Sequence, residues 1–252
     1  MALHNIGLKD IIHIYLLSLH HQIKTQNENR HSHSKEFAQV CSLLGEVKQT
    51  ARRGKTYTTG TIGSNEVVMV QCGIGKVNAA MWTTDMVNAF SPDVVISTGV
   101  AGGASTALNV QEVVVATESC YHDAYCGSDQ QYGQIMGMPP RFASDKALLR
   151  AASAIDCGTK ITPGLIVTGD WFVDSRDKMR AIVAHFPEAM AVDMESAAIA
   201  QACHQFGVPF ISFRIISDIP LKDDKASQYF DFWERMADSS FHVTRALLES
   251  IS

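Results

Sequence analysis

The chain has 252 residues, of which 46% are hydrophobic and 19% charged, with a formal net charge of −5. This composition suits one globular domain with a sizeable core and excludes disordered, collagen-like and coiled-coil chains. The slight acidity provides no electrostatic footprint for binding nucleic acid or an acidic membrane surface. The 6 cysteines form no CxxC pair and show no zinc-type spacing. We therefore expect reduced structural thiols in a cytoplasmic protein without a metal site.

Residues 1–34 differ in character from the rest of the chain. They are rich in histidine and contain the polar run Thr25–Arg30. Their one apolar segment, Ile11–Leu19, is too short to span a bilayer. The histidines lack acidic or thiol partners at metal-ligand spacing. We predict a poorly ordered extension over residues 1–34, followed by a single domain over residues 35–252.

Strand and helix patterns alternate along that domain. Two β-branched runs, Lys55–Ile62 and Glu66–Cys72, are joined by a turn-forming segment and predict a hairpin. Alternating buried strands and helices predict an α/β domain with a central, mostly parallel sheet and no internal repeat. The further strands are expected over Val94–Thr98, Glu112–Thr117, Gly164–Thr168 and Pro209–Ile216, and the helices over Val77–Phe90, Ser144–Ile155, Asp174–His185, Met194–Phe206 and Phe230–Leu248.

Polar or glycine-rich segments follow four of the predicted strands. Ligands of such sheets bind beyond the carboxyl ends of the strands, so these segments together predict an active site. The segments are Cys72–Gly75, Thr98–Gly103, Thr168–Phe172 and Ile216–Asp218.

Three side chains near these strand ends could carry chemistry, and each has a structural alternative. Asp218 follows an apolar run, where burial would raise its pKa and make it a proton donor, or it is a loop or N-cap aspartate. Glu195, at the start of an apolar helix, could hold a sugar diol through its two oxygens, or it caps the helix. Phe172 could stack on a planar base, although one aromatic ring is more often part of a core.

The glycine-rich segments match no standard nucleotide-binding loop. Gly73–Lys76 has neither P-loop spacing nor the dinucleotide fingerprint, and Gly99–Gly103 fails the same test. Both therefore predict backbone that approaches another group closely. The pair His122 and Asp123 could serve hydrolysis, but the chain has no Gly-x-Ser-x-Gly nucleophile elbow.

Taken together, these motifs resemble those of the 5'-methylthioadenosine/S-adenosylhomocysteine nucleosidases. The resemblance runs in order from about Lys35 to the C-terminus, and only the combination of motifs is specific. The segments that carry it are Gly73–Ala80, Thr98–Gly103, Tyr121–Asp123, Gly169–Val173, Val192–Glu195, Ala200–Phe210 and Ile216–Asp218.

The resemblance implies a nucleoside phosphorylase fold, which is a three-layer α/β/α domain, and a homodimer that needs no cofactor. It implies hydrolysis of the N-glycosidic bond of these thioadenosines, with release of adenine and a thioribose. Asp218 would protonate the purine at N7, and Glu36 would activate the water. The substrate-binding residues would be Glu195 on the ribose hydroxyls, Met194 on the sugar, Phe172 and Val173 at adenine, and Gly102 and Ser217 lining the pocket.

The chain departs from the family before Glu36. The family begins with a strand similar to Met-Lys-Ile-Gly-Ile-Ile-Gly-Ala-Met, whereas Gln26–Ser34 here is too polar for a buried strand. One codon spelling of Gln26–Ser34, read from an internal ATG in another frame, encodes Met-Lys-Ile-Gly-Ile-Val-Ile. We hypothesise a frameshift near Ser34, with a natural extension as the alternative. The nucleotide sequence of the gene decides between the two.

A second departure follows Asp123. The segment Tyr125–Tyr132 is polar and one residue shorter than the family pattern, which leaves the 5'-substituent preference open. Which aromatic residue caps the site is also undecided, with Tyr229 and Phe230 as candidates.

Two other functions compete with the nucleosidase hypothesis. A purine nucleoside phosphorylase of the same fold would need basic residues around phosphate, and the second glycine-rich segment has none nearby. A catalytically impaired purine-binding homologue would fit the unusual N-terminus but not the retained Asp218 and Glu195. Whether the reaction serves methionine salvage or signalling is left open.

Overall fold

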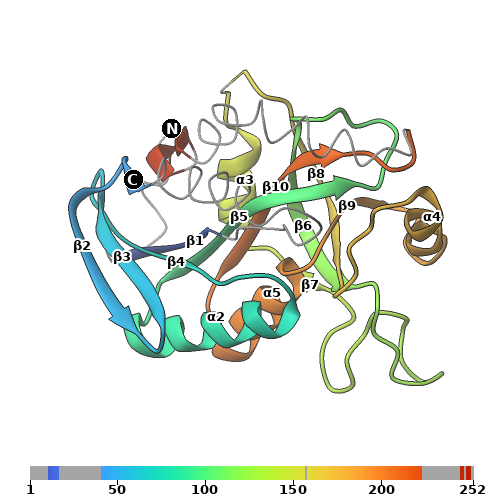
Figure 1. Ribbon diagram of the computed structural model, residues 1–252, viewed down its shortest axis with the longest axis horizontal. Helices are drawn as coiled ribbons and strands as arrows, with labels where there is room; N and C mark the ends of the chain where they lie inside the picture. The colour runs from blue at the N-terminus through green and yellow to red at the C-terminus, as the bar shows by residue number, and fades with distance from the viewer. Residues whose placement is uncertain (1–10, 17–40, 157, 223–244, 247, 251–252) are drawn as a thin grey trace, which may run out of the picture.

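The computed structural model describes residues 11–16, 41–156, 158–222, 245–246 and 248–250 (Figure 1). The helices are α2 (Lys76–Phe90), α3 (Lys146–Ser153), α4 (Arg176–His185) and α5 (Ser196–Phe206). The strands are β1 (Ile11–Leu16), β2 (Gly45–Arg52), β3 (Lys55–Ile62), β4 (Asn65–Gln71), β5 (Val94–Gly103), β6 (Val113–Tyr121), β7 (Phe142–Ala143), β8 (Ile161–Thr168), β9 (Ala189–Asp193) and β10 (Phe210–Asp218).

These strands form one mixed sheet in the order β10-β6-β8-β9-β5-β1-β4-β3-β2. An additional pairing between β10 and β5 closes the first five strands of that order into a ring. Parallel pairing joins β4, β1, β5 and β10, and the antiparallel strands β2 and β3 extend the sheet beyond β4. The long strand β5 belongs to both parts: Val94–Thr98 pairs with β1 of the open sheet, and Gly102 and Gly103 at its carboxyl end pair with β9 of the ring.

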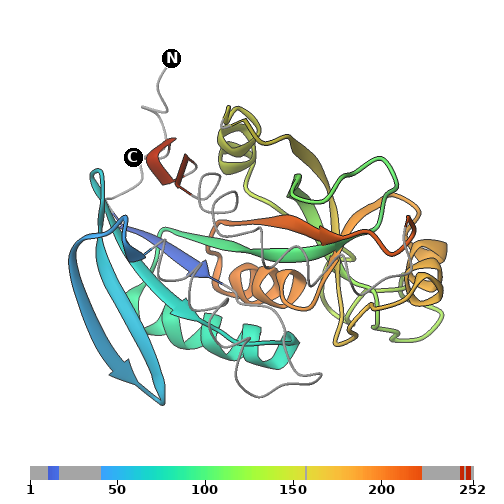
Figure 2. The ribbon, with the colours of Figure 1, turned by 45° about the horizontal axis from the view of Figure 1, so that its top comes forward.

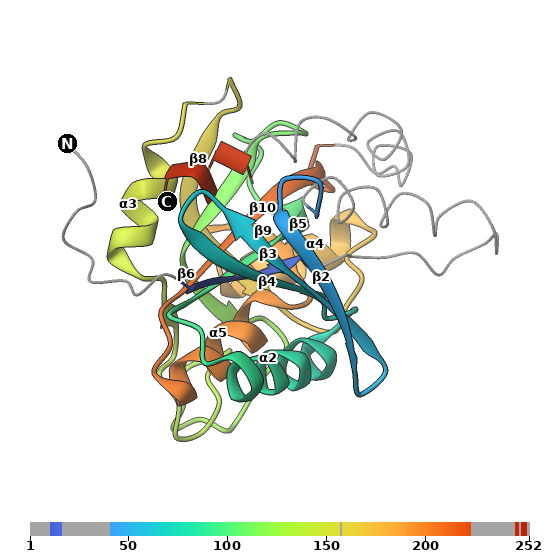
Figure 3. The same ribbon diagram turned by 90° about the vertical axis from the view of Figure 1, so that its left-hand side faces the viewer.

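Helices cover both faces of the sheet, with α3 on one side and α2 and α5 on the other (Figures 1 and 3). Figure 2 shows α5 running beneath β5 and β10. Strand β5 alternates accordingly: Ile96 belongs to the core cluster that contains Leu148 of α3, and Val95 to the cluster that contains Ala79 of α2. The predicted α/β/α class with a central mixed sheet is confirmed.

The predicted elements that fall within the described residues are present, but several strands are longer than expected. β5 continues through Gly99 to Gly103, because small residues there stay paired with β10 and β9. Four strands were not predicted, namely β1, β2, β7 and β9. β2 is an exposed edge strand without an apolar alternation, and β9 is only 5 residues long. The predicted helix Phe230–Leu248 lies almost wholly outside the described residues.

The first strand is where the structure differs most from the sequence-based expectation. Ile11–Leu16 lies within the segment predicted to be poorly ordered, yet it forms β1, paired in parallel with β4 on one side and β5 on the other. The physical reason is that β4 and β5 are parallel neighbours one strand apart, and the run Ile-Ile-His-Ile-Tyr-Leu has the β propensity to pair with both. The rest of residues 1–34 lies outside the described residues, so the extension and the frameshift stay predictions.

Proline at Ile14 tests whether this segment forms the central strand. Ile14 pairs with Met69 and Ile96, and Ile14→Pro removes a backbone N–H from a strand that is bonded on both sides. We expect the free energy of unfolding to fall by about 1–3 kcal/mol, because a buried acceptor loses its partner. Urea unfolding measures the change, with Ile14→Val, which keeps the N–H, as control. Equal stability of the two variants would place another segment between β4 and β5.

Candidate active site

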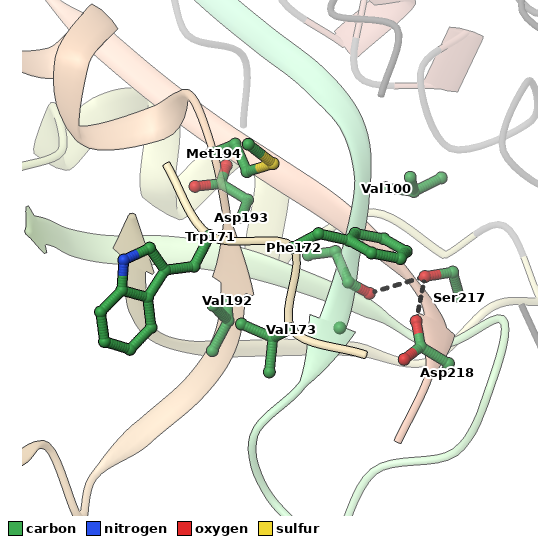
Figure 4. Close-up of a pocket in the computed structure, with 11 residues that line it drawn as sticks. Val100, Trp171, Phe172, Val173, Val192, Asp193, Met194, Ser217 and Asp218 are labelled. Atoms are coloured by element: carbon green, nitrogen blue, oxygen red, sulfur yellow. Dashed lines mark hydrogen bonds between the residues drawn. The ribbon is translucent and has the colours of Figure 1, made fainter. Parts of the chain in front are cut away.

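A pocket lies at the carboxyl ends of β5, β8, β9 and β10 (Figure 4). It unites segments that are far apart in the sequence. Three of the four predicted segments take part in it, whereas Cys72–Gly75 is not among its lining residues and the end of β9 is. Six of the predicted site residues line it together: Gly102, Phe172, Val173, Met194, Ser217 and Asp218. The other lining residues are Val100, Ala101, Trp171, Val192 and Asp193.

Asp218 is the last residue of β10 and lies opposite Gly102 of β5, just after an irregularity in the pairing. Its position in the pocket keeps water away from the carboxyl group, and this desolvation raises its pKa to about 6, against the opposing hydrogen bond from Ser217. Ser217 Oγ lies 2.6 Å from Asp218 Oδ1 and 3.2 Å from the Ala101 carbonyl oxygen. Asp218 can therefore hold a proton near neutral pH, and the Ser217 hydroxyl orients it.

Glu195 is fully buried and is the N-cap residue of α5, but its side chain makes no capping hydrogen bond. Its Oε1 atom accepts a hydrogen bond from the backbone N–H of Gly75 at 2.9 Å. Its Oε2 atom has no hydrogen-bond partner among the described residues. Desolvation, followed by the nearby Asp193 carboxylate, raises the pKa of Glu195 to about 8, against the opposing charge of Arg214. A role for this oxygen in binding a ligand hydroxyl stays a prediction.

A buried ion pair holds the turn that carries Met194 and Glu195. Arg214 Nε donates to Asp193 Oδ2 at 2.8 Å, and both side chains are 0% exposed. Asp193 also accepts a hydrogen bond from Thr168 Oγ1 at 2.6 Å. These contacts tie the ends of β8 and β9 to β10, which places the start of α5 beside the pocket.

Of two adjacent aromatic rings, only one faces the interior of the pocket. Figure 4 shows the Phe172 ring directed toward Val100 and Ser217, whereas the Trp171 indole points away. Trp171 is 46% exposed and stands edge-on to the His122 ring, with 5.4 Å between centroids. Phe172 is therefore the ring that faces the pocket, and its stacking on a planar ligand stays a prediction.

The glycine-rich turn before α2 does approach other groups closely. Gly75 has φ +90°, and a Cβ atom there would lie 2.9 Å from Asp170 Oδ1. The next backbone N–H, of Lys76, donates to Asp170 Oδ1 at 2.8 Å. Sequence reasoning predicted a close approach of backbone here but not its partners, the carboxylates of Glu195 and Asp170. The sequence feature that could have indicated these contacts is that Gly73–Lys76 and Gly169–Val173 both belong to the motifs that carry the family resemblance.

Some predicted residues cannot be placed. Glu36, Tyr229 and Phe230 lie outside the described residues, so their roles stay predictions. Within the part of the chain that is described, no group of three His, Cys, Asp or Glu side chains could hold a metal ion. In the same residues, no helix is long and apolar enough to cross a membrane.

Comparison with known proteins identifies the family to which this fold and pocket belong. The family model of the phosphorylase superfamily matches residues 32–251. A 5'-methylthioadenosine/S-adenosylhomocysteine nucleosidase of Anoxybacillus flavithermus is 40% identical over 221 residues, which cover 86% of this chain and 95% of that protein. One of Staphylococcus aureus strain Newman is 43% identical over 199 residues, covering 77% and 86%. The chain therefore belongs to the phosphorylase superfamily and, within it, to the 5'-methylthioadenosine/S-adenosylhomocysteine nucleosidases.

Solved structures of similar proteins agree with this assignment. The nucleosidase of S. pneumoniae with the transition-state inhibitor MT-ImmA superposes with a TM-score of 0.82 at 34% identity, covering 96% of this chain and 100% of that chain. The nucleosidase of Colwellia psychrerythraea in complex with adenine gives a TM-score of 0.83 at 30% identity, covering 97% of each chain.

The raised pKa of Asp218 predicts how stability depends on pH. The folded state binds this proton more tightly than the unfolded chain, so Asp218 destabilises the fold progressively as pH rises from about 4 to about 6 and fully above that. Asp218→Asn removes this effect. The variant should gain about 1–3 kcal/mol in free energy of unfolding relative to the wild type between pH 4 and pH 7.5, measured by urea unfolding.

Asp85→Asn is the matched control. Burial opposes ionisation of Asp85, but hydrogen bonds from Arg52 and Tyr57 outweigh this effect and lower its pKa. The Asp85 variant should therefore lose stability relative to the wild type as pH rises, the opposite direction. A pH-independent difference between Asp218→Asn and the wild type would contradict the raised pKa.

Proposed function

We propose that the chain hydrolyses the N-glycosidic bond of 5'-methylthioadenosine and S-adenosylhomocysteine, releasing adenine and the thioribose. One observation carries the proposal: a single pocket holds a carboxyl group of raised pKa, Asp218, beside the inward-facing ring of Phe172. A proton donor next to a stacking surface suits a purine that leaves with a proton. Similar proteins have been solved with adenine or with MT-ImmA, which supports the same substrate class.

The leaving group is activated by Asp218. Its proton passes to N7 of the purine while the bond from the ribose C1' to N9 breaks, and the bond's electron pair stays with adenine. The sugar then carries oxocarbenium character, as in glycoside hydrolysis. With a pKa of about 6, Asp218 retains enough protonated form near neutral pH to act as this acid.

The remaining residues bind the substrate and supply the nucleophile. Glu195 holds the ribose hydroxyls through its unpartnered Oε2 atom, beside Met194, which packs on the sugar. Phe172 stacks on adenine and the backbone of Val173 hydrogen-bonds its edge. By family resemblance, Glu36 takes a proton from the water that attacks C1'.

Water rather than phosphate is the acceptor in this proposal. Among the described residues, those that line the pocket include no lysine or arginine. The guanidinium of the buried Arg214 is already hydrogen-bonded to Asp193 and to Ser97. Since a phosphorylase must compensate the charge of phosphate, this environment disfavours phosphorolysis.

Adenine release tests the proposal. The wild-type chain should release adenine from 5'-methylthioadenosine at the same rate with and without phosphate, followed by absorbance. Asp218→Asn should lower turnover about 10²–10⁴-fold, because the departing base loses its acid, while the Kd for adenine changes little. Phosphate-dependent turnover would indicate a phosphorylase. Adenine binding without turnover in either buffer would indicate the impaired purine-binding homologue.

We also propose a cytoplasmic homodimer. Helix α2 and the turn before it present a stripe of exposed apolar side chains at helical spacing, namely Ile74, Val77 and Met81. The half-exposed Trp171 follows Asp170, which is hydrogen-bonded to the first residue of α2, so the stripe continues toward the pocket. A second copy of the chain is the occupant we propose for this surface. The described cysteines are free thiols, as expected in a reducing compartment.

Light scattering tests the dimer. The wild type should have about twice the 27.5 kDa mass of one chain, and Met81→Lys should shift it toward the monomer. Phe206→Lys, at an exposed apolar side chain near the end of α5, is the control and should remain dimeric. A monomeric wild type, or equal dissociation of both variants, would contradict this interface.

A further inference from the structure

Three motifs of the sequence each contain a charged residue to which the proposed reaction gives no role. These residues are Lys76, Asp123 and Asp170, and the structure brings them together at the start of α2. Lys76 Nζ lies 2.8 Å from both Asp123 Oδ1 and Asp123 Oδ2. Because three separate segments of the chain meet here, a shift of one segment would displace the others.

These contacts link Lys76, Asp123 and Asp170 to one another and hold the loop that follows β8. Asp123 Oδ2 accepts a hydrogen bond from the backbone N–H of Asp170 at 2.8 Å. Asp170 Oδ1 in turn accepts from the backbone N–H of Lys76 at 2.8 Å. The backbone and the side chain of Asp170 are therefore both held, one by the end of β6 and the other by the start of α2.

Burial makes these contacts matter more than ordinary surface ion pairs. The Asp123 side chain is 9% exposed and that of Lys76 is 25% exposed. Removing one charge from such a pair leaves the other poorly solvated. Steric contact adds to the constraint: a Cβ atom on Gly169 would lie 2.4 Å from the His122 ring and 2.8 Å from Asp123 Cγ. The loop thus rests directly on the segment that carries Asp123.

The held loop, residues 169–173, includes the adenine-binding pair of the proposed function. Phe172 and Val173 follow Asp170 by only two and three residues, so a shift of Asp170 moves both of them. The same turn before α2 also holds Glu195, through the N–H of Gly75. Consecutive backbone N–H groups thus fix the carboxylate assigned to ribose and the loop assigned to adenine.

We propose that Lys76 and Asp123 are positioning residues that hold loop 169–173 with Phe172 and Val173 directed into the pocket. The inference rests on the proposed function in taking adenine as the ligand of that loop. Neither residue lines the pocket, so both act through Asp170. Displacement of a binding group by about 1 Å can cost up to about 10²-fold in activity.

Asp123→Asn is the principal test, and Asp85→Asn is its matched control. Asp85 is also a 9%-exposed carboxylate paired with a cation, and it belongs to α2, but its partners Arg52 and Arg53 lie in the β2–β3 hairpin. For Asp123→Asn we expect the Kd for adenine to rise about 10- to 100-fold, with KM rising more than kcat falls. Amide hydrogen exchange in residues 169–173 should become at least about tenfold faster. Asp85→Asn should change none of these.

Substitutions of Lys76 supply a second, better tolerated test. Lys76→Met should reproduce the loss of adenine affinity and the faster exchange in residues 169–173. Lys76→Arg, which keeps a cation that can donate to Asp123, should restore most of both. If both Lys76 variants leave the exchange rate and adenine affinity of the wild type unchanged, the proposal is wrong.

The outcomes separate this proposal from the proposed function. A wild-type chain that binds no adenine would overturn the proposed function and the adenine role of the loop, whereas the exchange comparison still decides whether Lys76 and Asp123 hold it. Equal effects of Asp123→Asn and Asp85→Asn on adenine affinity would show a general loss of structure and overturn the positioning role.

Discussion

The buried ion pair between Asp193 and Arg214 joins the strands that carry the polar groups of the pocket. Both side chains are fully removed from water, and Thr168 and Ser97 supply further hydrogen bonds. Loss of one partner in such a pair leaves an uncompensated charge and costs about 3–5 kcal/mol. The pair holds the turn that carries Met194 and Glu195, so the geometry of this side of the pocket depends on two residues to which the proposed reaction gives no chemical role.

Desolvation then gives the carboxyl groups their properties. Asp218 and Glu195 both have pKa values above the ordinary range, because each is held where water cannot solvate its charge. Their different partners suit different tasks. Asp218 is held by the hydroxyl of Ser217, whereas Glu195 is held by the backbone N–H of Gly75 and its Oε2 atom has no hydrogen-bond partner among the described residues. In the proposed reaction the first would be the acid for the base and the second would bind the sugar.

Several parts of the fold could not be predicted from the local sequence pattern. β2 is an edge strand with polar residues on both faces, and β9 is too short to show periodicity. β1 was assigned to a poorly ordered segment, because the histidine-rich context concealed a short apolar run that needs two distant strands as partners. The contacts among Lys76, Asp123 and Asp170 could not be predicted from the local pattern either, since they join positions 47 and 94 residues apart.

The sequence by itself determined the α/β class, the hairpin, the main helices and three of the four strand ends expected at the pocket. It could do so because buried strands, helix periodicity and glycine-rich turns are local patterns. Its motifs also named the pocket residues Asp218, Phe172 and Met194. Only the tertiary structure decided that Phe172 and not Trp171 faces the pocket, that Glu195 is fastened to the turn before α2, and that the ring of strands is closed. Side-chain direction, desolvation and strand closure depend on residues far away in the chain, which no local pattern contains.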